Sequence, residues 1–205
     1  MSSTRVLILR HGQSVWNAEG RWQGQADIDL TDHGREQARL AAGLVASECP
    51  PFEAVVSSDL ARAAETADIV AGVLGCTNRH RDPRWRENHA GEWQGLTADE
   101  IRAQWPGYLE NDRRAPSFET VESTIARTFE ALTTIARHHT GGCVLVVSHG
   151  GVLRVLRHHL GAAEQRFPNL GGAWFEFDGS RWHNGSLLFP LELLADELRN
   201  TGQVE

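Results

Sequence analysis

The chain has 205 residues, of which 40% are hydrophobic and 23% charged, and its formal net charge is −7. That length suits one domain with a sizeable core, and the negative charge argues against a nucleic-acid or anionic-membrane partner, which would favour basic residues. All 20 basic residues are arginine, a bias typical of genome composition. The planar guanidinium nevertheless suits phosphate, because it binds oxyanions through two parallel hydrogen bonds.

The three cysteines are odd in number and far apart, so they predict neither a disulfide framework nor a zinc site; they are Cys49, Cys76 and Cys143. The N-terminus carries no apolar signal segment, and no apolar stretch is long enough to span a bilayer. We therefore expect a cytoplasmic protein with no metal and no cofactor. Because no repeat, low-complexity tract or linker divides the chain, residues 1–205 are expected to form a single domain.

Short β-branched runs alternate with amphipathic stretches along the chain. A strand at residues 6–9 precedes a helix at 34–48, a strand at 53–57 and a helix that Ser58 or Asp59 caps and that ends near Gly75. A short extended piece at 79–81, a short helix at 97–104 and a longer helix at 119–138 follow. The last predicted elements are a strand at 144–147, a helix to about residue 160, and antiparallel-looking strands at 174–177 and 186–189. This order predicts an α/β fold, a three-layer αβα sandwich with a mostly parallel central sheet.

Two of the predicted helices have an apolar stripe at helical spacing. In the helix at 34–48 the stripe comprises Leu40, Ala41, Leu44 and Val45, with Ala38 at its edge. In the helix at 119–138 it comprises Val121, Ile125, Phe129, Leu132 and Ala136. We expect these stripes to face the sheet.

Ligands of mostly parallel sheets bind at the carboxyl ends of the strands, and two of the best predicted strands end in a histidine. His11 follows the first strand, within Arg10-His11-Gly12, and His149 follows the strand at 144–147. Each is followed by a glycine, which lets backbone approach a ligand closely. A helix begins after His149, and its free N–H groups favour an anion. The sequence therefore predicts an anion site that contains both imidazoles.

Two charged residues elsewhere are further candidates. Arg62 lies in the first turn of a predicted helix, where the helix dipole disfavours a cation unless an anion binds in front of it. Glu87 lies in a loop rich in Trp and Gly, and such surroundings make it a candidate proton donor, although a loop glutamate is usually solvated.

Four segments together resemble the histidine phosphatase superfamily, in its phosphoglycerate mutase-like branch. They are Arg10-His11-Gly12, Ser58-x-Leu60-x-Arg62-x-x-Glu65-Thr66, Glu87 before Gly91-x-Trp93-x-Gly95, and Ser148-His149-Gly150. They follow the family order, and the match extends from Arg5 to about Gly161. The segments Ser57–Leu60 and Gly91–Leu96 also resemble phosphatases that act on glucosyl-3-phosphoglycerate.

The resemblance implies a role for each matching residue. His11 is the nucleophile that accepts the phosphoryl group, and Glu87 protonates the leaving oxygen and then deprotonates the attacking water. Arg10, Arg62 and His149 hold the phosphoryl oxygens, and the two arginines make Mg²⁺ unnecessary. The substrate-binding set is completed by Asn17, Gln23, Gly24 and Gly150.

The function that the sequence favours is hydrolysis of small phosphomonoesters, with a small phosphorylated metabolite as the partner. A phosphoglycerate mutase is the first alternative; the short stretch between Glu87 and Glu119 disfavours it, because mutases of this family usually have an inserted segment there. A non-catalytic phosphate-binding regulatory module is the second, disfavoured because the nucleophile and the acid are both present. A homodimer, the effect of Phe118 at a position where the family often has Gly, and a substrate-binding role for Arg113 and Arg114 are left open.

Overall fold

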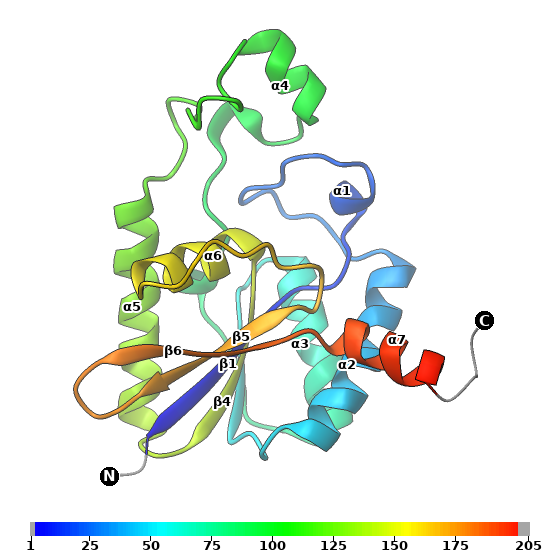
Figure 1. Ribbon diagram of the computed structural model, residues 1–205, viewed down its shortest axis with the longest axis vertical. Coiled ribbons are helices and arrows are strands. Elements are labelled where there is room, and N and C mark those ends of the chain that lie inside the picture. The colour runs from blue at the N-terminus through cyan, green and yellow to red at the C-terminus, as the bar shows by residue number, and fades with distance from the viewer. Residues whose placement is uncertain (1–2, 201–205) are drawn as a thin grey trace.

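The computed structural model describes residues 3–200, and its strands form one six-stranded sheet in the order β3-β2-β4-β1-β5-β6 (Figure 1). The strands are β1 (Thr4–Arg10), β2 (Ala54–Ser57), β3 (Arg79–Arg81), β4 (Cys143–Ser148), β5 (Gly172–Phe177) and β6 (Trp182–Leu188). The first four pair in parallel, and β5 and β6 extend the sheet in antiparallel pairing. The predicted mostly parallel sheet is therefore confirmed.

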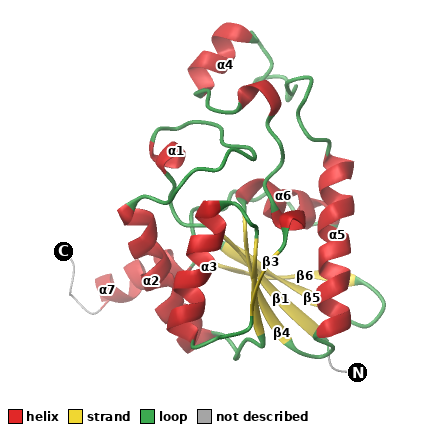
Figure 2. Ribbon diagram, turned by 180° about the vertical axis from the view of Figure 1, so that it is seen from behind, coloured by secondary structure: helices red, strands yellow, loops and turns green. Residues whose placement is uncertain are grey.

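Helices cover both faces of this sheet. They are α1 (Val15–Ala18), α2 (Asp32–Glu48), α3 (Ala61–Leu74), α4 (Ala98–Gln104), α5 (Val121–His138), α6 (Gly150–His159) and α7 (Pro190–Asn200), with two 3-10 turns, η1 (Pro83–Trp85) and η2 (Gly91–Trp93). Figure 2 shows α2 and α3 on one side of the sheet and α5 and α6 on the other, with α4 standing apart from it. The sequence did not predict α1, α7 or the 3-10 turns. Within residues 3–200, no helix is both long and apolar enough to cross a bilayer.

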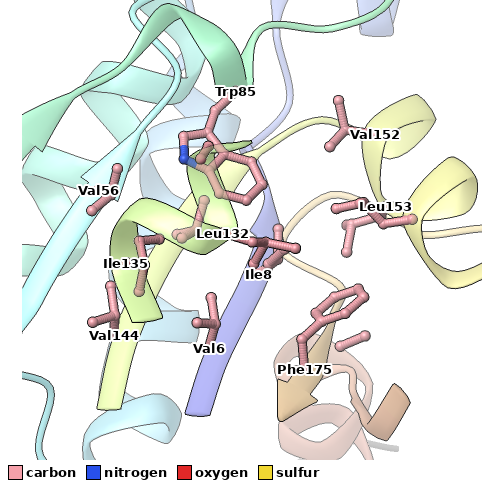
Figure 3. Close-up of a cluster of buried hydrophobic side chains, with 14 of the residues drawn as sticks. Val6, Ile8, Val56, Trp85, Leu132, Ile135, Val144, Val152, Leu153 and Phe175 are labelled. Atoms are coloured by element: carbon pink, nitrogen blue, oxygen red, sulfur yellow. The ribbon is translucent and has the colours of Figure 1, made fainter. Parts of the chain in front are cut away.

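Two hydrophobic clusters lie on opposite faces of the sheet, because side chains of a strand alternate between its faces. In β1, Val6 and Ile8 belong to the cluster under α5 and α6, which Figure 3 shows. Leu7 and Leu9 belong to the cluster under α2 and α3. All four side chains are fully buried. This arrangement confirms the predicted three-layer αβα sandwich.

The buried faces of α2 and α5 differ from the predicted stripes. Leu40 is 50% exposed, whereas Ala38 at the predicted edge is fully buried. In α5, Val121 is 50% exposed, and Thr124 and Thr128 are fully buried instead. The Thr128 hydroxyl donates to the Thr124 carbonyl one turn earlier, at 2.6 Å, so a threonine can be buried without an unpaired polar group. A pattern that counts only apolar residues misses this face.

The predicted cap of α3 is wrong. The N-cap residue is Leu60, which makes no side-chain capping bond, and neither Ser58 nor Asp59 caps the helix. The amide of Ala61 donates instead to Asp27 Oδ1 at 2.7 Å. Asp59 forms an ion pair with Arg86. Helix α3 is therefore capped by a residue that lies far away in the sequence.

Candidate active site

The two strand-end histidines meet at the carboxyl edge of the sheet. Because β1 and β4 are neighbours in parallel register, with Arg10 opposite Ser148, His11 and His149 leave the sheet side by side. Their ring centroids lie 5.1 Å apart in an edge-on arrangement. Both side chains are buried, with 2% of His11 and none of His149 exposed. The structure thus brings together the two imidazoles that the sequence singled out.

The surroundings of His11 determine which ring nitrogen is available. Its Nδ1 lies 2.6 Å from the carbonyl oxygen of Gly12, and because a carbonyl only accepts, Nδ1 carries the proton. Nε2 is then unprotonated, and its lone pair accepts a hydrogen bond from Arg62 Nε at 3.2 Å. Burial, followed by the charges of Arg62 and Arg10, holds the His11 pKa well below its usual value, so the ring is neutral at pH 7. A neutral imidazole with an unprotonated Nε2 can act as a nucleophile once that hydrogen bond is exchanged for a substrate.

His149 is buried without hydrogen bonds. Neither of its ring nitrogens has a hydrogen-bond partner among the side chains that the structure describes, those of residues 3–195. Burial, together with nearby cations of which Arg62 contributes most, lowers its pKa well below the usual value. Buried polar groups are nearly always paired in folded proteins, so an unpaired imidazole beside another catalytic candidate points to a ligand that completes it.

Arg62 is fully buried and joins three parts of the site. Its Nε donates to His11 Nε2 at 3.2 Å, and its two terminal nitrogens donate to the carbonyls of Gly24 and Ala26, both at 2.8 Å. Burial lowers the pKa of Arg62 to about 10, so the guanidinium stays charged at pH 7. A buried cation without a carboxylate hydrogen-bond partner is available to an incoming anion.

Arg10 contributes a second cation. Its Nη1 donates to the Phe167 carbonyl at 2.8 Å, and burial lowers its pKa, an effect that the charge of Glu87 opposes. Gly150, the first residue of α6, lies against this side chain, since a Cβ at Gly150 would lie 3.5 Å from Arg10 Cδ. Arg10 and Arg62 both lie close enough to His11 and His149 for their charges to lower the pKa values of the two imidazoles.

Glu87 faces the start of α6. Its carboxylate accepts hydrogen bonds from the amides of Gly151 and Asn88, both at 2.9 Å. A Cβ at Gly151 would lie only 2.3 Å from Glu87 Oε1, so only glycine permits this approach. The structure thus places Glu87 near the two histidines, although the loop that carries it is distant from both in sequence.

The remaining predicted residues lie on the segment that follows His11. Asn17 Oδ1 accepts from Asn169 Nδ2 at 3.2 Å, and Gln23 Oε1 accepts from the Ser14 hydroxyl at 2.7 Å. Gly24 has a φ of 51°, in the left-handed region, which lets its carbonyl face Arg62. The loop that carries Gln23 and Gly24 is therefore fixed to the centre of the site by Arg62.

Sequence reasoning missed two residues of the site. Asn169 Nδ2 donates to the His11 carbonyl at 2.9 Å, and the adjacent Leu170 has a left-handed φ of 61°, which is rare for a branched residue and marks a strained site loop. Gln25 Nε2 donates to the Glu87 carbonyl at 2.9 Å. The Pro168-Asn169 pair before two glycines was a turn signal that could have drawn attention to the first.

Phe118, Arg113 and Arg114 lie in the segment between α4 and α5. Phe118 packs edge-on against Trp22 and Trp93, with ring centroids 6.2 and 6.0 Å away, so it belongs to a hydrophobic cluster. Arg113 is exposed and lies over the Tyr108 ring at 4.1 Å, and the exposed Arg114 forms an ion pair with Asp112. The structure therefore shows both arginines engaged with neighbours on the surface. Among residues 3–195, whose side chains the structure describes, no group of His, Cys, Asp and Glu side chains could hold a metal ion.

Comparison with known proteins identifies the family to which the chain belongs. Residues 6–184 match the model of the histidine phosphatase superfamily (branch 1). The metal-independent phosphoserine phosphatase of Arabidopsis thaliana is 38% identical over 160 residues, which are 75% of this chain and 67% of the relative. The glucosyl-3-phosphoglycerate phosphatase of Mycolicibacterium vanbaalenii is 36% identical over 196 residues, 87% of this chain and 86% of the relative.

A solved structure is similar over nearly the whole chain. It is the mycobacterial glucosyl-3-phosphoglycerate phosphatase in complex with VO3, with a TM-score of 0.75 and 30% sequence identity over 88% of this chain and 96% of that one. The chain therefore belongs to the histidine phosphatase superfamily, branch 1, and is a phosphoric monoester hydrolase of the histidine phosphatase type.

Proposed function

We propose that this protein hydrolyses small phosphomonoesters through a phosphohistidine intermediate formed on His11. The observation that carries the proposal is the state of the His11 ring, which is buried and neutral, with Nδ1 bound to the Gly12 carbonyl and Nε2 turned toward Arg62. In the first step Nε2 attacks the phosphorus atom, and the bond between phosphorus and the ester oxygen breaks. The phosphoryl group is then bonded to nitrogen.

Arg10, Arg62 and His149 stabilise the phosphoryl oxygens in this proposal. Phosphoryl transfer depends mainly on positioning and on neutralising charge, and two buried guanidinium groups supply both. His149 donates a hydrogen bond to a phosphoryl oxygen, which satisfies a ring nitrogen that is otherwise unpaired. Asn17, Gln23, Gly24 and Gly150 complete the substrate-binding set.

Glu87 is the proposed general acid and base. The carboxyl group gives its proton to the leaving oxygen, so the alcohol departs neutral. The resulting carboxylate takes a proton from water, and that water attacks phosphorus and breaks the bond to Nε2. Phosphate leaves, and His11 and Glu87 return to their starting protonation states. Hydrogen bonds from the amides of Gly151 and Asn88 orient the carboxylate for both steps.

Two other functions are weaker explanations of the same site. Relatives named as phosphoglycerate mutases match the chain too, but the segment between Glu87 and Glu119 holds η2 and α4 with little room for an insertion that would shield a phosphoenzyme from water. A non-catalytic phosphate-binding module would not need a nucleophile and an acid in the same site. Hydrolysis gives a role to both the proposed nucleophile and the proposed acid, and it requires no inserted segment.

Phosphate release with EDTA present tests the proposal. The native protein and the His11→Ala variant are compared on p-nitrophenyl phosphate, phosphoserine, 3-phosphoglycerate, glucosyl-3-phosphoglycerate, sugar phosphates and nucleotides. Release that disappears in His11→Ala would support the phosphohistidine route, as would acid-labile, base-stable ³²P labelling of the native protein alone. Substantial turnover by His11→Ala would remove His11 from this role, and interconversion of phosphoglycerates in place of release would favour the mutase. Loss of activity in EDTA that Mg²⁺ or Zn²⁺ restores would contradict the proposed metal independence.

Several further expectations from the sequence stay predictions. They are the cytoplasmic location, the single domain over residues 1–205, the homodimer and the absence of a nucleic-acid partner. The relatives favour a small phosphorylated metabolite as the substrate, and the panel above ranks the candidates.

A further inference from the structure

The backbone that leads to Glu87 is held by side chains from other elements of the fold. Four successive carbonyls, those of residues 84–87, each accept a side-chain hydrogen bond. Arg127 Nη1 donates to the carbonyls of Arg84 and Arg86, at 2.7 and 2.6 Å. The Ser148 hydroxyl donates to the carbonyl of Trp85 at 2.8 Å. A loop usually leaves most of its carbonyls to solvent, so this segment is unusually restrained.

The side chain of Trp85 anchors the same segment from below. It is fully buried in the cluster under α5 and α6, and Figure 3 shows it above Leu132 and Ile8. Burial of the Trp85 side chain fixes the distance between this segment and the sheet. A single hydrophobic contact still allows the backbone on either side to rotate about that side chain. The orientation of the next two residues depends on the hydrogen bonds to the carbonyls on either side of Trp85.

Arg127 supplies both of those bonds, and Glu119 fixes Arg127. Arg127 Nε and Nη2 donate to the two carboxylate oxygens of Glu119 at 2.8 and 3.0 Å. The ion pair is largely shielded, with side chains 17% and 10% exposed. Glu119 also accepts from the amide of His89 at 3.2 Å, and its own amide donates to the His89 carbonyl. The Arg127–Glu119 pair therefore forms hydrogen bonds with the backbone on both sides of Glu87, at residues 84 and 86 before it and at His89 after it.

We propose that Arg127 is a positioning residue that holds Glu87 at the leaving oxygen. The inference rests on the proposed role of Glu87 as general acid. Arg127 lies outside the set of groups that bind the phosphoryl oxygens, and it acts through the backbone of residues 84–86. A shift of about 1 Å in a catalytic group is enough to lower a rate about 100-fold. Loss of the hydrogen bonds from Arg127 to the carbonyls of Arg84 and Arg86 should therefore impair proton donation by Glu87.

The leaving group distinguishes this role from a general structural one. Esters with a good leaving group, such as p-nitrophenyl phosphate, need little help from an acid, whereas phenyl phosphate and alkyl phosphates need it strongly. Arg127→Lys is the most informative variant. Lysine keeps a positive charge near His149 but lacks the planar guanidinium that binds Glu119 and the two carbonyls together. We expect kcat/KM to fall about 10-fold or more on phenyl phosphate and less than about 3-fold on p-nitrophenyl phosphate.

Arg35→Lys is the matched control. Arg35 forms a similar forked pair with Glu65 between α2 and α3, at 2.7 and 3.3 Å, but makes no contact with residues 84–87. It should leave the ratio of the two kcat/KM values unchanged. If Arg127→Lys lowers activity equally on both esters, Arg127 does not position the acid.

A double-mutant cycle with Glu87→Gln adds an independent criterion. In the Glu87→Gln background, Arg127→Lys should change kcat/KM on phenyl phosphate by less than about 2-fold, because the group that it positions is gone. Multiplicative effects of the two substitutions would overturn the proposal. If Arg127→Lys does not fold, Glu119→Gln releases the same guanidinium with a smaller change, and it should give the same leaving-group pattern; a uniform loss in Glu119→Gln would overturn the inference.

The native protein separates this inference from the function on which it rests. If the native protein releases no phosphate from either ester, the proposed function fails, and the positioning role falls with it. If the native protein is active and Glu87→Gln shows the leaving-group effect while Arg127→Lys does not, only the positioning role fails.

Discussion

Mild acid should destabilise the folded protein through the two histidines of the site. Burial, aided by nearby cations, lowers the pKa of both His11 and His149 well below the ordinary histidine value of about 6.5. Below pH 6.5 the unfolded chain therefore binds more protons than the folded one, and the free energy of unfolding falls as the pH falls. Between pH 7.5 and 5.5, each histidine that stays neutral in the fold contributes a loss of about 1.4 kcal/mol, and the pair together about 2.7 kcal/mol.

This pH window isolates the histidines from the carboxylates. The pKa of Asp59 is lowered chiefly by its hydrogen bond with Arg86, and the pKa of Glu119 is lowered by Arg127 although burial opposes this shift. Both carboxylates lose their stabilising effect only at more acidic pH, because an unfolded carboxyl titrates near pH 4. The other histidines are common to native and variant proteins and cancel in the comparison. The difference in pH slope between native protein and variant therefore reports the buried pair.

Urea unfolding at pH 7.5, 6.5 and 5.5, in buffers without phosphate, measures this slope. Phosphate is left out because a ligand that binds the folded state would raise its apparent stability. The native protein should lose about 2.7 kcal/mol more than the His11→Gln, His149→Gln double variant, and each single variant should lie about midway. The absolute stability of a variant does not matter, since only its change with pH is compared. The same pH slope in the native protein and the double variant would refute the neutral, buried state of the two imidazoles.

Three more predictions follow from single contacts. Gly151→Ala places a methyl group 2.3 Å from Glu87 Oε1, so kcat on phenyl phosphate should fall about 100-fold, with a smaller loss on p-nitrophenyl phosphate in parallel assays. Arg62→Lys cannot reach His11, Gly24 and Ala26 together, and steady-state kinetics should show kcat/KM at least about 100-fold lower on both esters. Gly43→Ala adds a methyl group to open space on α2, so urea unfolding should show a stability gain of about 0.5–1 kcal/mol; a loss would contradict the packing described for this helix.

Much of the fold follows from local sequence patterns. The apolar runs around Val6 and Val144 are strands because a β-branched run bounded by turn residues has few other favourable conformations, and both are buried on two faces as parallel strands usually are. Once β1 and β4 are parallel neighbours, the residues that follow them must meet at one edge. The sequence therefore predicted that His11 and His149 lie at the same edge of the sheet, and the strand order, in which β4 is next to β1, brings them side by side.

The sequence by itself predicted which residues carry the chemistry and at which edge of the sheet they gather. Only the tertiary structure decided how they are held, because the contacts that hold them join residues far apart in the chain and leave no local pattern. Asp27 caps α3 in place of Ser58, Asn169 binds the His11 carbonyl, and Arg127 binds the carbonyls before Glu87. Hydrogen bonds of this kind depend on where two elements cross, and any polar side chain of suitable length can make them. Residue identity thus predicts a nucleophile and an acid, whereas their alignment is a property of the packed fold.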